Sequence, residues 1–190
     1  MAINLSKGQN ISLDKEAPGM TQLHVGLGWD VQQSTGASFD LDVVVFLTGE
    51  DGKALSDKHF VFFNNLTSPD SAVVHQGDNL TGEGEGDDEV VHIQLPQVDP
   101  AVQKVVFAVS IHEADTNNQN FGQVRNAFIR VVDRSNDQEF LKYELDEDFS
   151  TSTAIVVAEV YRRGAEWKFR ALGEGHTGGL QKLLQAHGLS

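Results

Sequence analysis

Nine segments of the chain carry hydrophobic patterns that are typical of β-strands. Apolar and polar residues alternate in some of them, and others are runs rich in β-branched residues. Gly, Asn, Asp and Pro residues separate the segments and favour turns. The expected strands span residues 23–29, 39–47, 59–63, 90–95, 105–111, 127–132, 139–145, 154–161 and 167–172.

This succession of strands predicts an all-β fold, a two-sheet β-sandwich, because the turn signals do not fit alternating strands and helices. Residues 100–104 favour one helical turn before a strand. Residues 179–187 place leucines at helical spacing, which predicts a short C-terminal helix. We expect this helix to pack on the edge of the sandwich, with docking to another protein as the alternative. We interpret residues 1–190 as a single domain.

The charge of the chain limits its partners. Its 14 Lys and Arg residues against 28 Asp and Glu residues give a net charge of −14. Direct binding of nucleic acid is disfavoured, because no run of basic residues opposes this field. The first residues lack the basic flank and apolar run of a signal peptide, and we find no transmembrane segment in the sequence. We therefore expect a cytoplasmic protein.

The absence of Cys excludes disulfides, thiolate metal sites and thiol redox chemistry. Seven His residues are scattered along the chain without the spacing of zinc-binding helices. The chemistry that remains is that of carboxylates.

Residues 77–89 contain six carboxylates and four glycines between two strand segments. Glycines let the backbone turn with φ of either sign. Carboxylates forced together repel by roughly 4 kcal/mol per pair at about 4 Å with an effective dielectric near 20. A hard divalent cation such as Ca²⁺, which takes six to eight oxygen ligands, suits such a supply of oxygens. The segment, which we call the acidic loop, therefore predicts a metal site.

Known templates do not describe the acidic loop. Leu80, Gly82 and Glu83 fall where an EF-hand needs oxygen ligands or its invariant glycine. A phosphate cradle is disfavoured, because the loop has no Lys and its acids would repel phosphate. The alternative that stays open is an acidic hairpin tip without any metal.

A second group of carboxylates lies on the expected strand 39–47. Strand alternation places Asp40 and Asp42 on the same face, about 7 Å apart, where both reach a cation above the strand. Asp30 and Glu113 follow the ends of two other strand segments. A solvated face at Asp40 and Asp42, and turn formation at Asp30 and Glu113, are the alternatives.

Several motifs together carry a family resemblance. They are Gly26-Leu-Gly-Trp-Asp30, Phe39-Asp-Leu-Asp42, Phe62-Phe-Asn-Asn65, the acidic loop, Gln119-Asn-Phe-Gly122 and Gly164-Ala-Glu-Trp-Lys-Phe-Arg170. Over nearly the whole chain they resemble the TerD family of bacterial tellurium-resistance and stress proteins. The resemblance implies a β-sandwich that binds Ca²⁺, two ions, in acidic loops of a non-enzymatic protein.

Carried onto this chain, the resemblance assigns metal ligands to the acidic loop and to the acids at strand ends. At Glu113 and Asp115 the chain departs from many members, which carry Asp and then Glu there; the charge is kept. The expected ligands are Asp30, Asp40, Asp42, Asp78, Asn79, Glu83, Asp87, Asp88, Glu89 and Glu113.

The implied role is resistance to tellurite and other stresses. Tellurite is a dianion, and a chain of net charge −14 without Cys is poorly equipped to bind or reduce it. We therefore expect a calcium-structured module that assembles with other tellurium-resistance proteins, with a membrane-linked complex as one candidate site of assembly.

Two other functions are compatible with the sequence. One is a metal-dependent hydrolase, with Asp40, Asp42 and Asp78 holding Mg²⁺ or Mn²⁺ and His75 or His112 as the base. The other is a structural or self-assembling protein whose acidic loops only keep it soluble.

Overall fold

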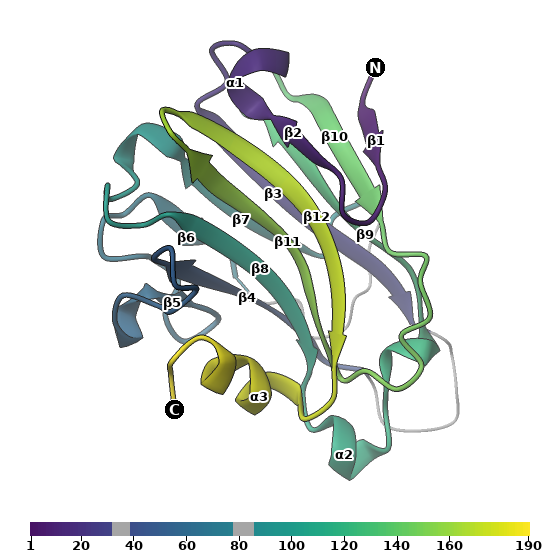
Figure 1. Ribbon diagram of the computed structural model, residues 1–190. Coiled ribbons are helices and arrows are strands. Elements are labelled where there is room, and N and C mark those ends of the chain that lie inside the picture. Colours follow the sequence, from purple (N-terminus) through teal and green to yellow (C-terminus); the bar gives the residue numbers. More distant parts are fainter. Residues whose placement is uncertain (32–38, 78–85) are drawn as a thin grey trace.

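Two β-sheets packed face to face make up the computed structural model, which describes residues 1–31, 39–77 and 86–190 (Figure 1). In this described part each sheet has six strands. Apart from one parallel pair, β1 with β10, all paired strands are antiparallel. The all-β sandwich expected from the sequence is confirmed.

The first sheet contains, in spatial order, β1 (Ile3–Leu5), β10 (Gln138–Glu144), β9 (Val124–Asp133), β3 (Gln22–Val31), β7 (Glu89–Gln94) and β6 (Val73–His75). The second sheet contains β2 (Asn10–Ser12), β12 (Glu166–His176), β11 (Ala154–Arg163), β8 (Lys104–Ile111), β4 (Leu41–Thr48) and β5 (Phe60–Val61). The α-helices are α1 (Leu13–Glu16), α2 (Ala114–Asn117) and α3 (Gly179–Ala186). Short 3₁₀ turns are η1 (Asp57–His59), η2 (Leu95–Gln97) and η3 (Phe121–Gln123). None of these helices is long and apolar enough to cross a membrane.

The main core lies between the sheets, and it takes alternate residues of each strand. In β4, Leu41, Val43 and Val45 face this core, whereas Val44 and Phe46 belong to a second apolar cluster on the outer face of the second sheet. Every residue of β4 is therefore buried. This double burial explains why β4 is a continuous apolar run after Asp42.

The second cluster is covered by α3, which lies against the outer face of the second sheet (Figure 1). Leu183 of α3 is 1% exposed there. Beyond the helix, the His187 ring stacks on Phe46 with centroids 4.0 Å apart, and Lys53 donates a hydrogen bond to the Ala186 carbonyl at 2.9 Å. The helix was thus expected at the correct place in the chain, but it covers a sheet face and not a sheet edge.

Short edge elements differ from the sequence prediction. The strands β1, β2 and β6 were not expected, because three residues are too few to show a period of two. The expected strand 59–63 shrinks to β5, because the Asn65 amide donates to the Phe60 carbonyl and closes a turn. The turn expected at 100–104 is not helical; the Val102 N–H donates to the Asp99 carbonyl at 2.9 Å.

Two glycines of β3 leave room for side chains that cross the outer face of the first sheet. A Cβ atom on Gly26 would lie 2.2 Å from the Asp87 carboxylate, and one on Gly28 would lie 2.4 Å from the Phe128 ring. Real Cβ contacts are essentially never this short. The Gly-x-Gly of this strand therefore lets Asp87 and Phe128 lie flat against the sheet.

The packing of α3 generates a first prediction. Leu183→Ala truncates the most deeply buried residue of α3 and should destabilise the protein by about 2–5 kcal/mol. The loss cannot exceed the free energy that holds α3 on the sheet, because beyond it the helix detaches while the sandwich stays folded. Thermal unfolding and amide hydrogen exchange of residues 179–186 measure this. The control, Gln185→Ala on the exposed side of α3, should change neither, and an unchanged melting temperature for Leu183→Ala would contradict the packing.

The close approach at Gly26 generates a second prediction. Gly26→Ala should displace the Asp87 carboxylate and lower stability by about 2 kcal/mol, the size of a hydrogen bond to a charged group. In an Asp87→Ala background the same change should cost much less, because the obstructing carboxylate is gone. Denaturant unfolding of the four proteins of this cycle measures the coupling. Additive effects would show that Gly26 serves another purpose.

Candidate functional site

The C-terminal end of the acidic loop is tied to the strand that carries Asp42. Glu89 begins β7 and is 2% exposed. Its Oε2 atom accepts a hydrogen bond from the Val43 N–H of β4 at 3.0 Å. This N–H is accessible because β4 pairs with β5 only at Val45 and Phe46. Two segments 46 residues apart in the chain, one from each sheet, therefore meet at this carboxylate.

His75 completes this buried contact. Its Nε2 lies 3.1 Å from Glu89 Oε2, and its Nδ1 accepts a hydrogen bond from the Gly77 N–H at 3.0 Å. The second contact assigns the ring proton to Nε2, which donates to Glu89. The His75 side chain is 1% exposed and both its nitrogens are engaged. This arrangement does not support His75 as the base of a hydrolase.

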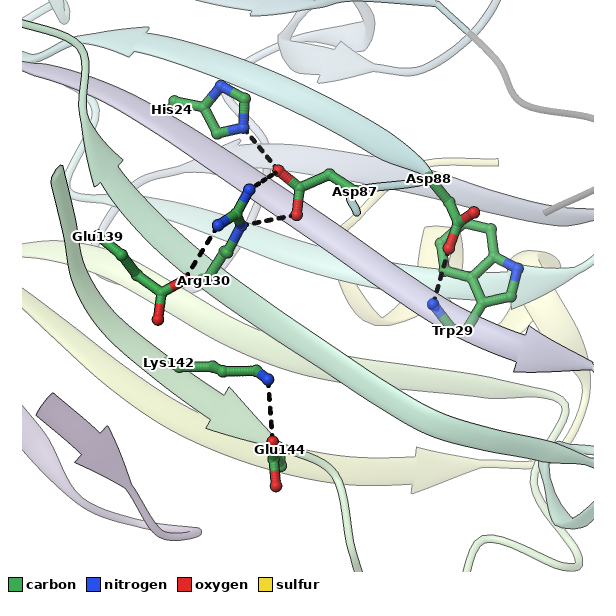
Figure 2. A network of polar contacts seen from close by, with 8 residues as sticks. All are labelled: His24, Trp29, Asp87, Asp88, Arg130, Glu139, Lys142 and Glu144. Carbon is green, nitrogen blue, oxygen red and sulfur yellow. Dashed lines mark hydrogen bonds and ion pairs between the residues drawn. The ribbon is translucent and has the colours of Figure 1, made fainter. Parts of the chain in front are cut away.

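Asp87 is held by Arg130 and His24 on the outer face of the first sheet (Figure 2). Arg130 donates to its two oxygens at 2.8 and 2.9 Å, and His24 Nε2 lies 2.8 Å from Oδ2. Burial disfavours the charged carboxylate, but the hydrogen bonds from Arg130 and His24 prevail and lower the pKa of Asp87. Arg130 also donates to Glu139 at 3.0 Å. Both oxygens of Asp87 therefore have protein partners, and we interpret Asp87 as an anchor of the acidic loop; its role as a metal ligand stays a prediction.

Asp88 points to a different place (Figure 2). Its Oδ2 accepts a hydrogen bond from the Trp29 N–H at 2.7 Å. Burial raises the pKa of Asp88; the Trp29 bond opposes this rise, and the negative charges of Asp30 and Asp87 add to it. Asp30 and Asp88 line one cavity of about 810 Å³. Asp30 itself is exposed and accepts a hydrogen bond from Asn126 at 2.8 Å.

Asp42 and Glu113 line a second cavity, of about 300 Å³, between the ends of β4 and β8 and the start of α3. Asp42 is 6% exposed, whereas Glu113 is exposed. Asp40 lies just before β4, and its carbonyl accepts the His112 N–H at 2.8 Å. Glu113 has a φ of 52°, which is uncommon outside glycine. The segment 112–113 is therefore fixed beside the Asp40–Asp42 pair.

The remaining predicted ligands are Asp78, Asn79 and Glu83, and they lie outside the described residues. Within residues 1–31, 39–77 and 86–190, no three acidic or histidine side chains gather closely enough to hold a metal ion. Of the predicted ligands, Asp30 and Asp88 line one cavity together with three further acids, and Asp42 and Glu113 line another together with Asp115. We call Asp30 with Asp88, and Asp42 with Glu113, the two acid pairs.

The chemistry of these pairs fits a hard cation. Both consist of carboxylates, which are ligands of Ca²⁺, and neither pair includes a histidine or a thiolate. The raised pKa of Asp88 reflects partial burial and like-charge repulsion, which a bound divalent cation would relieve. In the described residues each pair supplies fewer oxygens than a Ca²⁺ ion takes, so a complete shell would need further ligands.

Sequence reasoning missed the partners of Asp87. Arg130 and His24 sit on two neighbouring strands and face Asp87 across the sheet only because Gly26 pairs with Arg130 in register. Nothing in the local sequence of either residue signals this contact. Predicting these partners of Asp87 would have required the register between β3 and β9.

Comparison with known proteins identifies the family. The chain matches the TerD domain model over residues 1–187. It is 50% identical over 190 residues to the tellurium resistance protein TerD of Serratia marcescens, covering 100% of this chain and 99% of that relative. It is 47% identical over 190 residues to general stress protein 16U of Bacillus subtilis (strain 168), covering 100% of this chain and 98% of that relative.

A solved structure agrees with the fold. A homologue of telluride resistance protein (TerD) from Streptomyces coelicolor A3(2) superposes with a TM-score of 0.72 at 24% identity, covering 87% of this chain and 95% of that chain. Family model, relatives and fold point the same way. The chain belongs to the TerD domain family, whose members include tellurium resistance and general stress proteins.

Proposed function

We propose that this chain is a non-enzymatic Ca²⁺-binding protein of the bacterial tellurite and stress response. In this proposal Ca²⁺ binds at the acidic strand ends and stiffens them into a surface on which other proteins assemble. Its relatives are named for tellurium resistance and for general stress. The observation that carries the metal proposal is that Asp30 and Asp88 line one cavity; burial and neighbouring acids also raise the pKa of Asp88.

The acids fall into two pairs, which is consistent with two ions. Asp30 and Asp88 would contribute to one site, and Asp42 and Glu113 to the other, with Asp40 adjacent to the second. The acidic-loop residues Asp78, Asn79 and Glu83 are proposed from the sequence as the additional ligands. Glu89 would act by holding the acidic loop to β4 through Val43. When bound, Ca²⁺ would supply charge neutralisation and not chemical activation.

A non-enzymatic role is favoured over hydrolysis. The base that hydrolysis would take from His75 is engaged at both nitrogens, and His112 is exposed beside Glu113. The net charge of −14 and the lack of Cys also disfavour direct capture or reduction of the tellurite dianion. We therefore propose an assembly role in the cytoplasm with other tellurium-resistance proteins, including at a membrane-linked complex.

Calcium should raise the melting temperature of the protein. A ligand at one hundred times its dissociation constant stabilises the folded state by about 2.7 kcal/mol, and each kcal/mol shifts the melting temperature of a chain of this size by roughly 2–4 °C. Thermal unfolding with chelator and with millimolar Ca²⁺, together with isothermal titration, measures this. Equal melting temperatures under both conditions would contradict the proposal.

The effect of Asp88→Asn on the stability of the protein should have opposite signs in chelator and in Ca²⁺. The amide oxygen still accepts the Trp29 N–H, so in chelator the loss of repulsion should leave the protein as stable or more stable. In Ca²⁺ the loss of a charged ligand should make it less stable than the unsubstituted protein. Asp57→Asn, an exposed acid in η1, should change neither condition. A loss of stability of the same size with and without Ca²⁺ would show that Asp88 is only structural.

The cellular phenotype should follow the metal. In a tellurite-sensitive host that requires this protein for resistance, Asp42→Asn and Asp88→Asn should lower the tolerated tellurite concentration several-fold at unchanged protein abundance. The Asp57→Asn control should retain full resistance. Purified protein should not consume tellurite with or without Ca²⁺, and measurable reduction by the pure protein would overturn the assembly role.

A further inference from the structure

One end of the first sheet carries a hollow most of whose lining residues belong neither to the anchors nor to the proposed metal pairs. The cavity of about 810 Å³ beside Asp30 and Asp88 adjoins a second one of about 400 Å³ beside Leu5. The two share Lys142, Glu144 and two residues that follow β10. We call these two adjoining cavities the acidic trough.

The acidic trough crosses four neighbouring strands. Its lining comes from the ends of β3, β9 and β10 and from β1, which are adjacent in the sheet. Strands lie about 4.8 Å apart, so the trough spans about 14 Å. An extended peptide covers this length with about four residues. A hollow of this shape suits a segment of chain better than a compact small molecule.

Apolar and charged residues together line the acidic trough. Trp29, Phe128 and Leu145 line the larger cavity. Phe128 can lie low against the sheet because Gly28 has no Cβ to obstruct its ring. Five carboxylates line this cavity against two cationic side chains, Arg125 and Lys142. The five are Asp30, Asp88, Glu144, Asp146 and Glu147.

The protein itself shows how the acidic trough holds a cationic side chain. The Lys142 ammonium lies 2.9 Å from Glu144 Oε1 (Figure 2) and 4.6 Å from the centre of the Phe128 ring. A carboxylate and an aromatic face therefore bind one ammonium together. The long aliphatic stems of Lys and Arg also favour an apolar lining. The remaining acids line the same cavity and offer further carboxylates to a cationic side chain.

We propose that the acidic trough is a docking site for an extended, basic segment of a partner protein, with Lys or Arg at alternating positions. The charge complementarity between such a segment and the carboxylates of the trough selects it over neutral or acidic chains. Glu144, Asp146 and Glu147 supply this charge whether or not a cation occupies Asp30 and Asp88. The trough shares Asp30 and Asp88 with the proposed calcium residues. Its test therefore uses Glu144 and Glu147, which the calcium proposal does not use.

The probe is a blocked hexapeptide that alternates Lys and Ala, added to the full chain at about 0.15 M salt, where long-range attraction is screened. Trp29 reports on binding in a Trp167→Phe background, because Trp29 lines the trough and Trp167 does not, and calorimetry measures the same event independently. We expect saturable binding that Glu144→Gln with Glu147→Gln weakens at least about fivefold, as two partly exposed ion pairs would give.

The matched control is Glu50→Gln with Asp57→Asn, which removes the same charge from exposed sites beside β4 and β5. It should leave peptide affinity unchanged. Equal weakening by both double variants would reduce the effect to net charge, and equal binding of spermine would reduce it to a polycation effect. Binding seen by neither fluorescence nor calorimetry would also overturn the proposal.

Two further measurements distinguish a basic partner from a second copy of this chain and from Ca²⁺. Sedimentation that shows self-association, abolished by the Glu144 and Glu147 changes, would identify a second copy of this chain and overturn the basic-partner proposal. The melting shift in Ca²⁺ should persist in the same double variant. We expect the double variant to lose peptide binding and to keep its melting shift in Ca²⁺. If the unsubstituted chain shows the melting shift in Ca²⁺ but does not bind the peptide, the docking proposal is wrong and the calcium proposal is unaffected.

Discussion

Three consecutive carboxylates fasten the start of β7 to three different parts of the molecule. Asp87 lies on the outer face of the first sheet against Arg130, Asp88 accepts the backbone N–H of Trp29, and Glu89 enters the interior to accept the N–H of Val43. Side chains of successive residues diverge at a strand start, so one short acidic run can reach all three. The position of the whole acidic end of the sandwich depends on these anchors.

The anchors also decide which acids remain for a cation. A bidentate guanidinium compensates the charge of a carboxylate more fully than a backbone N–H does. Asp87 accepts from the guanidinium of Arg130 and Asp88 from the Trp29 N–H, and their pKa values move in opposite directions from the ordinary value. Sequence adjacency therefore does not imply a shared role. Fixed by their different partners, the two acids divide into an anchor and a metal candidate.

Much of the fold was predictable because it rests on patterns within single segments. The long strands show alternation over enough residues, and the leucines near Leu183 show helical spacing. The edge strands β1, β2 and β6 are too short for either signal. The placement of α3 on a sheet face, with Phe46 stacked on His187, depends on a cluster assembled from five separate elements.

The candidate site was predictable in its residue types but not in its grouping. Local sequence identified Asp30 and Glu113 at strand ends, Asp42 on one face of a strand and Asp88 in the acidic loop. Only strand order and register decide that Asp30 shares a cavity with Asp88. Strand order also explains why Glu144 was not predicted as a site residue. It lies near Asp30 only because β10 is beside β9, and β9 is beside β3.

The proposed metal pairs and the acidic trough are physically connected through Asp30 and Asp88. A Ca²⁺ ion held by these two residues would remove up to two negative charges from the trough, leaving the three acids that end and follow β10. The negative electrostatic potential that attracts a basic segment would then be weaker on the β3 side of the trough and unchanged on the β10 side. Metal and partner would compete for the charge of Asp30 and Asp88, which weakens the binding of each in the presence of the other. Both would also bind better to a rigid sheet end. The coupling free energy between the two ligands is the difference between these two effects. Because Asp88 is fixed by the Trp29 N–H in either case, the electrostatic part should dominate, and metal binding would shift a basic partner toward the β10 side instead of creating its site.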